Sequence, residues 1–128
     1  MIWKMLIIIV AFLMPYLSRL PGVFSRDATW FWSYLPSWGG FAFLSIFNAL
    51  AVVPLLVLAF VGDNSRVGYA FLITAAVHGL ATFWFNYNYD LAADAQAGIA
   101  LIVFPLAVLG ITTVVGLVTF FGERMIKQ

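Results

Sequence analysis

The sequence contains no cysteine and very little charge. Its 128 residues include six lysines and arginines, five aspartates and glutamates, and one histidine. The absence of cysteine excludes a disulfide framework, thiol redox chemistry, and metal or iron–sulfur sites held by thiolates. The formal net charge of +1 indicates neither a basic surface for nucleic acid nor an acidic tail.

The sequence motifs of common catalytic sites are also missing. The chain has no P-loop, no glycine-rich nucleotide fingerprint, no His-Glu-x-x-His zinc motif and no Gly-x-Ser-Gly serine-protease motif. A single histidine offers a haem iron only one axial imidazole. We therefore expect a protein that is not an enzyme, with no catalytic residue, no metal ligand and no cofactor.

Hydrophobic residues dominate what is present. They make up 65% of the chain, and the mean hydropathy is +1.07, whereas soluble domains are about half apolar and a quarter charged. Three runs without a formal charge, residues 38–62, 67–87 and 97–121, each reach the about 20 residues that cross a bilayer. The composition therefore predicts a membrane protein.

A fourth apolar run, residues 5–17, is shorter and lies between Lys4 and Arg19. It spans the bilayer only if both basic side chains extend to the headgroup layers. A secretory signal peptide is the alternative, with Lys4 as its basic region and residues 6–14 as its apolar region. We expect a single all-α transmembrane domain, residues 1–128, folded as an antiparallel four-helix bundle with spans at about 3–20, 38–62, 67–87 and 93–121.

The link between the first two spans has the pattern of an amphipathic helix. Phe24, Ala28, Phe31 and Leu35 recur at helical spacing, with polar residues between them. We expect an interfacial helix at about 25–35, capped by Ser25 and ended before the proline at position 36.

The basic residues predict the orientation. With four spans, both termini and the 62–66 turn share one side, which carries Lys4, Arg66, Arg124 and Lys127. The positive-inside rule then places both termini in the cytoplasm. In the 62–66 turn, a glycine ends one helix and Asn64 or Ser65 can cap the next.

The opposite, outer face collects aromatic and acidic residues. Tryptophan and tyrosine are common anchors at the membrane interface, but the same residue types are enriched in binding surfaces. Asp90 and Asp94 are one helical turn apart, where an N-cap and a first-turn acid would begin the last span. The predicted outer partner surface comprises Asp27, Trp30, Trp32, Tyr34, Trp38, Trp84, Tyr89, Asp90 and Asp94.

Polar residues inside the spans form one stripe. In the third span Thr74, His78, Thr82 and Asn86 are spaced by four, and the second span carries Ser45 and Asn48. Intramembrane polar groups need protein partners, so we expect His78 to bond Ser45, Asn48 or a carbonyl freed near Pro54. A polar path for transport is the alternative. Pro15, Pro54 and Pro105 each remove a backbone hydrogen bond and bend a helix.

Residues 90–105, DLAADAQAGIALIVFP, resemble a recurring segment of short uncharacterised bacterial inner-membrane proteins. The resemblance implies a bacterial inner-membrane location and brings no activity. We expect a non-enzymatic membrane protein that binds another membrane protein, as an accessory subunit or an immunity-type inhibitor, or that self-associates. A small oligomeric transporter or channel is the alternative.

Overall fold

The computed structural model describes every residue except 33–37, 63–67, 88, 91–96 and 127–128, and it does not describe the side chains of 38–40 and 97. Within this described part the regular structure is entirely helical. The helices are α1 (Ile2–Leu17), α2 (Leu20–Ser25), α3 (Thr29–Trp32), α4 (Trp38–Ala51), α5 (Val53–Val61), α6 (Tyr69–Tyr87) and α7 (Ala97–Ile126).

Two helical stretches of the described chain are long and apolar enough to cross a membrane, Ile2–Ser25 and Gly98–Ile126. The bent pair α4 and α5 makes a third if it is counted as one span. The 19-residue helix α6 is not among them, because its polar stripe lowers its hydropathy. The structure thus supports two or three spans where the sequence predicts four.

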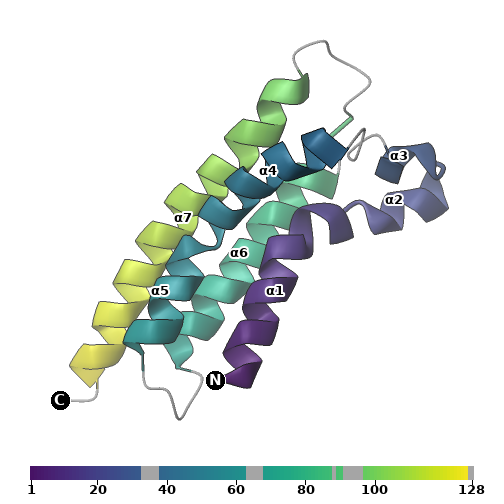
Figure 1. The fold of residues 1–128 in the computed structure, drawn as a ribbon. Coiled ribbons are helices and arrows are strands. Elements are labelled where there is room, and N and C mark those ends of the chain that lie inside the picture. The colour runs from purple at the N-terminus through teal and green to yellow at the C-terminus, as the bar shows by residue number, and fades with distance from the viewer. Residues whose placement is uncertain (33–37, 63–67, 88, 91–96, 127–128) are drawn as a thin grey trace.

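The long helices lie side by side (Figure 1). Helix α6 packs against both α1 and α7, and α7 packs against the α4 and α5 pair. The start of α1 and the end of α7 lie at the same end of the molecule, while α2 and α3 project sideways from the other end (Figure 1). We call the first the terminal end and the second the outer end.

The bend between α4 and α5 follows from proline chemistry. The two helices meet at Val52 at an angle of 43°. Pro54 lies in the first turn of α5, where its missing N–H costs nothing to α5 but leaves the Leu50 carbonyl of α4, four residues earlier, without its helical donor. Pro15 and Pro105, in contrast, lie inside helices that continue through them.

The link predicted as one interfacial helix is two short helices. Ser25 was expected to begin a helix at about 25–35, but it ends α2. The Asp27 carboxylate accepts hydrogen bonds from the Thr29 backbone N–H and hydroxyl, so a new helix begins there. Pro21 in the first turn of α2 favours the earlier start. The single-helix prediction was wrong because these local caps override the hydrophobic spacing.

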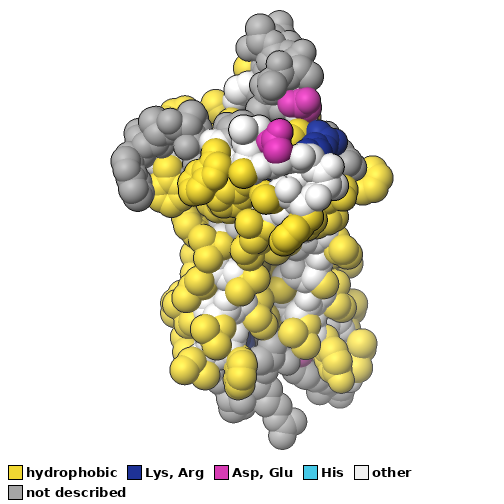
Figure 2. Space-filling view, turned by 90° about the vertical axis from the view of Figure 1, so that its right-hand side faces the viewer, with side chains coloured by type: hydrophobic (Ala, Val, Ile, Leu, Met, Phe, Trp, Pro, Cys, Tyr) yellow, Lys and Arg dark blue, Asp and Glu magenta, His cyan; other side chains and the backbone are white. Residues whose placement is uncertain are grey.

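A hydrophobic core cluster lies between α1, α5 and α6. Leu55, Ala59 and Phe71 are its most buried members, and Ile8 of α1 completes it. Helix α7 approaches closely at Gly116, where a Cβ atom would lie 3.4 Å from Leu58. Large hydrophobic side chains are instead exposed over the sides of the molecule, and on the face in Figure 2 acidic and basic side chains are visible near the outer end. This distribution suits a lipid environment.

Candidate functional site

The two basic residues that flank the apolar run of α1 are buried. Lys4 is 2% exposed and Arg19 is 1% exposed. The sequence predicted a span here only if both side chains extend to the headgroup layers, whereas the structure buries both against protein. An ideal helix places them about 22 Å apart, less than the about 30 Å of hydrocarbon, so α1 is too short to carry both charges out of the bilayer core along its axis. Both side chains turn into the protein instead.

Lys4 binds the end of α5. Its Nζ donates to the Ala59 carbonyl at 3.4 Å, and it lies close to Gly62, where α5 ends. The last carbonyls of a helix have no intrahelical donor and carry partial negative charge. A buried ammonium is therefore stabilised at this position.

Arg19 binds three backbone carbonyls at the outer end. Its Nε donates to Trp30 at 3.1 Å, and its Nη1 donates to Asn86 at 3.3 Å and to Tyr89 at 2.9 Å. The planar guanidinium presents several donors in fixed directions, which a lysine cannot do. One side chain thus joins the end of α1 to α3 and to the C-terminal end of α6.

Trp30 lies at the centre of the outer end. The guanidinium of Arg19 lies 4.2 Å from its ring centre and that of Arg26 lies 3.8 Å from it. A Cβ atom on Gly22 would overlap the indole, so α2 and α3 pack through this glycine. Trp30 was predicted to be part of the outer partner surface, but it is buried and supports that surface from beneath.

Other predicted outer-face residues are accessible. Trp32 is 62% exposed, and Phe24, which the sequence placed on the apolar face of the interfacial helix, is 93% exposed. Asp27, Trp84 and Asp90 are exposed, and the half-buried Tyr89 packs edge-on against Phe104. Tyr34, Asp94 and the side chain of Trp38 lie outside the described residues.

The structure leaves the predicted capping role of Asp90 and Asp94 untested. Asp90 is exposed and not helical, and residues 91–96, which include Asp94 and precede the first described residue of α7, lie outside the described residues. Asp27, which was not predicted to cap a helix, caps α3. The two hydrogen bonds from Thr29 stabilise its carboxylate and hold the pKa of Asp27 below its ordinary value.

The polar stripe of α6 faces the interior. Thr74, His78, Thr82 and Asn86 are all buried. The Thr74 hydroxyl donates to the Ala70 carbonyl at 2.7 Å and the Asn86 amide donates to Thr82 at 2.8 Å, so both bond their own helix. Such bonds satisfy these two side chains within α6, whereas His78 reaches another helix.

His78 bonds a carbonyl that a proline has freed. Its Nε2 lies 3.1 Å from the Ala11 carbonyl of α1. Pro15 follows Ala11 by four residues and has no N–H, so α1 itself supplies no donor there. Because a carbonyl only accepts, Nε2 carries the proton. The backbone of Ala51, at the end of α4, also borders the ring.

The structure thus joins His78 to α1 and not to Ser45 or Asn48. Its contact with the Ala51 backbone, three residues before Pro54, agrees with the third expected partner, a carbonyl near that proline. Ser45 and Asn48 approach Tyr16 of α1 instead, whose hydroxyl accepts from the Asn48 Nδ2 at 3.4 Å. The sequence analysis missed Tyr16. Its signal was the one hydroxyl group in a strongly apolar helix, since buried tyrosine hydroxyls usually find a partner.

Glu123 of α7 is a second residue that the sequence analysis missed. Its Oε2 accepts from the Ala70 N–H at 3.0 Å, and the carboxylate lies beside Gly68. A negative charge at this position satisfies a free N–H group and complements the dipole of α6. The capping residues predicted for α6, Asn64 and Ser65, lie outside the described residues.

The contacts described above connect helices to one another. Within the described residues, no three His, Asp or Glu side chains lie together as metal ligands would. No protein-family model matches the chain, and searches of curated proteins and of solved structures found no match.

Proposed function

We propose that the chain is a four-span protein of the bacterial inner membrane, with both termini in the cytoplasm, that acts by binding another membrane protein. It would serve as an accessory subunit or as an immunity-type inhibitor. Helix α6 lies between α1 and α7, which supports its counting as a span despite its polar stripe. Its polar groups are buried against protein, as they must be in hydrocarbon.

The observation that carries the proposal is a set of exposed side chains at the outer end, on short helices that Arg19 holds through hydrogen bonds. We define the outer patch as Phe24 on α2, Arg26 directly after α2, and Trp32 on α3. Phe24 and Trp32 expose most of their surface, while the exposed Arg26 stacks on the buried indole of Trp30. Tryptophan and arginine dominate binding hot spots, and a surface held in place before binding loses less entropy on association.

The alternative use of the outer patch is simple anchoring at headgroup depth. Anchors need only an amphipathic ring near the interface, whereas a binding surface needs fixed geometry. Arg19 supplies that geometry, since it ties the backbone of α3 to the end of α6. This bracing favours protein binding over anchoring.

A photo-crosslinking residue placed at position 24 in native membranes tests the proposal. We expect a protein adduct of defined mass, and we expect Trp32→Ala or Arg26→Ala to reduce it. The matched control is the same residue at position 60, since Phe60 is also well exposed but lies on α5. Adducts with lipid alone at position 24 would instead support anchoring.

Substitution of the buried His78 distinguishes partner binding from transport. We expect His78→Ala to lower stability because it removes the bond to Ala11, and we expect no flux from the purified chain in liposomes. A pH-dependent conductance that His78→Ala abolishes without changing folding would replace the proposal with a small oligomeric channel.

A further inference from the structure

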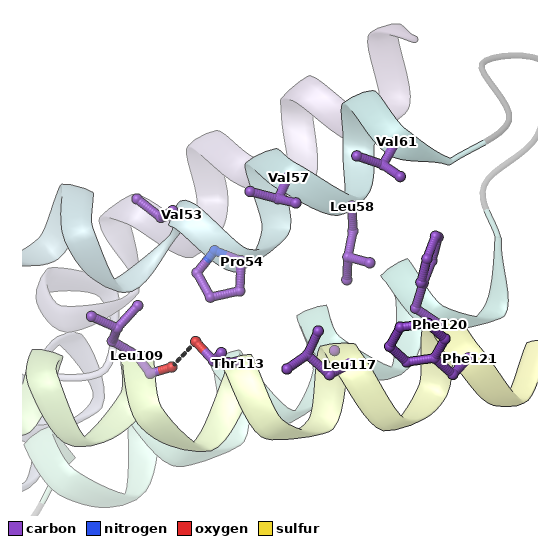
Figure 3. Close-up of a pocket in the computed structure, with 11 residues that line it drawn as sticks. Val53, Pro54, Val57, Leu58, Val61, Leu109, Thr113, Leu117, Phe120 and Phe121 are labelled. Carbon is purple, nitrogen blue, oxygen red and sulfur yellow. Dashed lines mark hydrogen bonds between the residues drawn. The ribbon is translucent and has the colours of Figure 1, made fainter.

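An apolar groove runs between α5 and α7 (Figure 3). Its volume is about 270 Å³. Val53 and Leu109 lie at one end, and Val61 lies with Phe120 and Phe121 at the other (Figure 3). The remaining lining residues are Pro54, Val57, Leu58, Thr113, Gly116 and Leu117.

The side chains that line the groove favour a hydrocarbon ligand over a polar one. Among the described residues that line the groove, Thr113 alone has a polar side chain, and its hydroxyl already donates to the Leu109 carbonyl at 2.7 Å. Water needs two to four polar partners in a cavity, and apolar cavities stay dry. The groove therefore offers neither water nor a polar ligand the hydrogen bonds that it would need.

The end of the groove nearest the chain termini carries a positive charge. The guanidinium of Arg124 lies 4.5 Å from the ring centre of Phe120, which lines the groove, and the residue is exposed. Guanidinium groups bind phosphate oxygens with two parallel hydrogen bonds. From Phe120 back to Leu109 the groove extends about 16 Å along α7. It is thus an apolar slot with a cationic end.

We propose that this groove binds an anionic phospholipid, with one acyl chain between α5 and α7 and the phosphate on Arg124. A helix of a second copy fits less well, because a helix is about 10 Å across and a 16 Å stretch of it would fill more than about 1,000 Å³. The groove has only about 270 Å³. The site is independent of the outer patch and lies at the opposite end of the molecule.

Native mass spectrometry of the delipidated full chain in detergent tests the charge. The probes are phosphatidylglycerol and phosphatidylcholine with the same long acyl chains. We expect phosphatidylglycerol to bind more tightly, and Arg124→Gln to weaken it about fivefold, toward the level of phosphatidylcholine. Arg26→Gln removes the same charge at the outer end and is expected to leave the affinity unchanged.

A second pair of variants tests the groove. Val57→Phe adds volume inside the slot, and we expect it to weaken phosphatidylglycerol binding. Val114→Phe, an equal change at an exposed site on α7 outside the groove lining, is expected to have no effect. If Val57→Phe does not fold, shortening both acyl chains of the lipid provides the same test, because a shorter chain fills less of the slot.

Three results would overturn the proposal. Equal binding of both lipids, unchanged by Arg124→Gln, would show that lipids cover the apolar surface without a specific headgroup site. Phosphatidylglycerol binding that is insensitive to Val57→Phe and to acyl length would show a headgroup contact without the groove. A dimer that Val57→Phe dissociates would make a second copy the occupant.

Discussion

Arg19 and Arg26 show how one residue type takes two roles within the outer end. Both guanidinium groups lie on the same indole, that of Trp30. Arg19 is buried and bonds three carbonyls, whereas Arg26 is exposed. A buried charge is tolerated only when its hydrogen bonds are well made, so the geometry of Arg19 matters more than its charge.

Arg19→Lys tests that geometry while keeping the charge. A lysine has one terminal nitrogen and cannot replace both the Nε and the Nη1 donors, so at least one carbonyl is left unbonded. We expect a loss of about 2 kcal/mol in the free energy of unfolding in detergent micelles. Arg26→Lys is the matched control and is expected to change stability little. Equal effects of the two substitutions would contradict the bracing role of Arg19.

At the scale of helices, side chains from elsewhere in the chain cap the end of α5 and both ends of α6. Lys4 of α1 binds the end of α5, Arg19 binds the end of α6, and Glu123 of α7 binds its start. Such caps link helix formation to packing. The helices are therefore expected to form together rather than one by one.

Glu123→Gln and Glu123→Ala separate the charge of the Glu123 cap from its hydrogen bond to the Ala70 N–H. Glutamine keeps an oxygen that can accept from the Ala70 N–H but loses the charge, so we expect a cost of about 0.5 kcal/mol. Alanine loses both, and we expect about 1 kcal/mol or more. Hydrogen exchange at the Ala70 amide locates the effect, since only a cap at this position protects it. Unchanged exchange in Glu123→Ala would refute the cap.

The joint between α1 and α6 is tested by a double-mutant cycle. His78→Leu removes the donor to the Ala11 carbonyl, while Pro15→Ala restores a backbone N–H that can bond the same carbonyl. We therefore expect His78→Leu to cost about 1 kcal/mol less in the Pro15→Ala background. Thermal or denaturant unfolding in detergent provides the four free energies.

Pro105→Ala is the matched control for this cycle. It restores an N–H in α7, where the freed carbonyl belongs to Leu101 and not to the residue that His78 binds. We expect its effect to add to that of His78→Leu without coupling. Coupling of similar size in both cycles would show that His78 senses general helix straightening rather than the Ala11 carbonyl.

At the scale of the whole molecule, the sequence predicted the helical class and most of the long helices. Hydrophobic runs locate α1, α4 with α5, α6 and α7 because burial in lipid or protein depends on local composition. The sequence pattern could not locate the partners of Lys4, Arg19 and Glu123, which lie more than 50 residues away in several cases. Local patterns do not report such distant contacts. The α2 and α3 pair was missed because capping by Asp27 overrode the hydrophobic spacing.

The orientation in the membrane is the property on which both proposals depend. The native chain has no cysteine, so single cysteines can be introduced without a background. Ala28 lies exposed between α2 and α3, and Met125 is exposed at the end of α7. The excess of basic residues at the terminal end predicts that this end is cytoplasmic. In intact cells we expect a membrane-impermeant maleimide to label Ala28→Cys, and to label Met125→Cys only after the membrane is opened. The reverse pattern would place the outer patch in the cytoplasm and the Arg124 end of the groove outside.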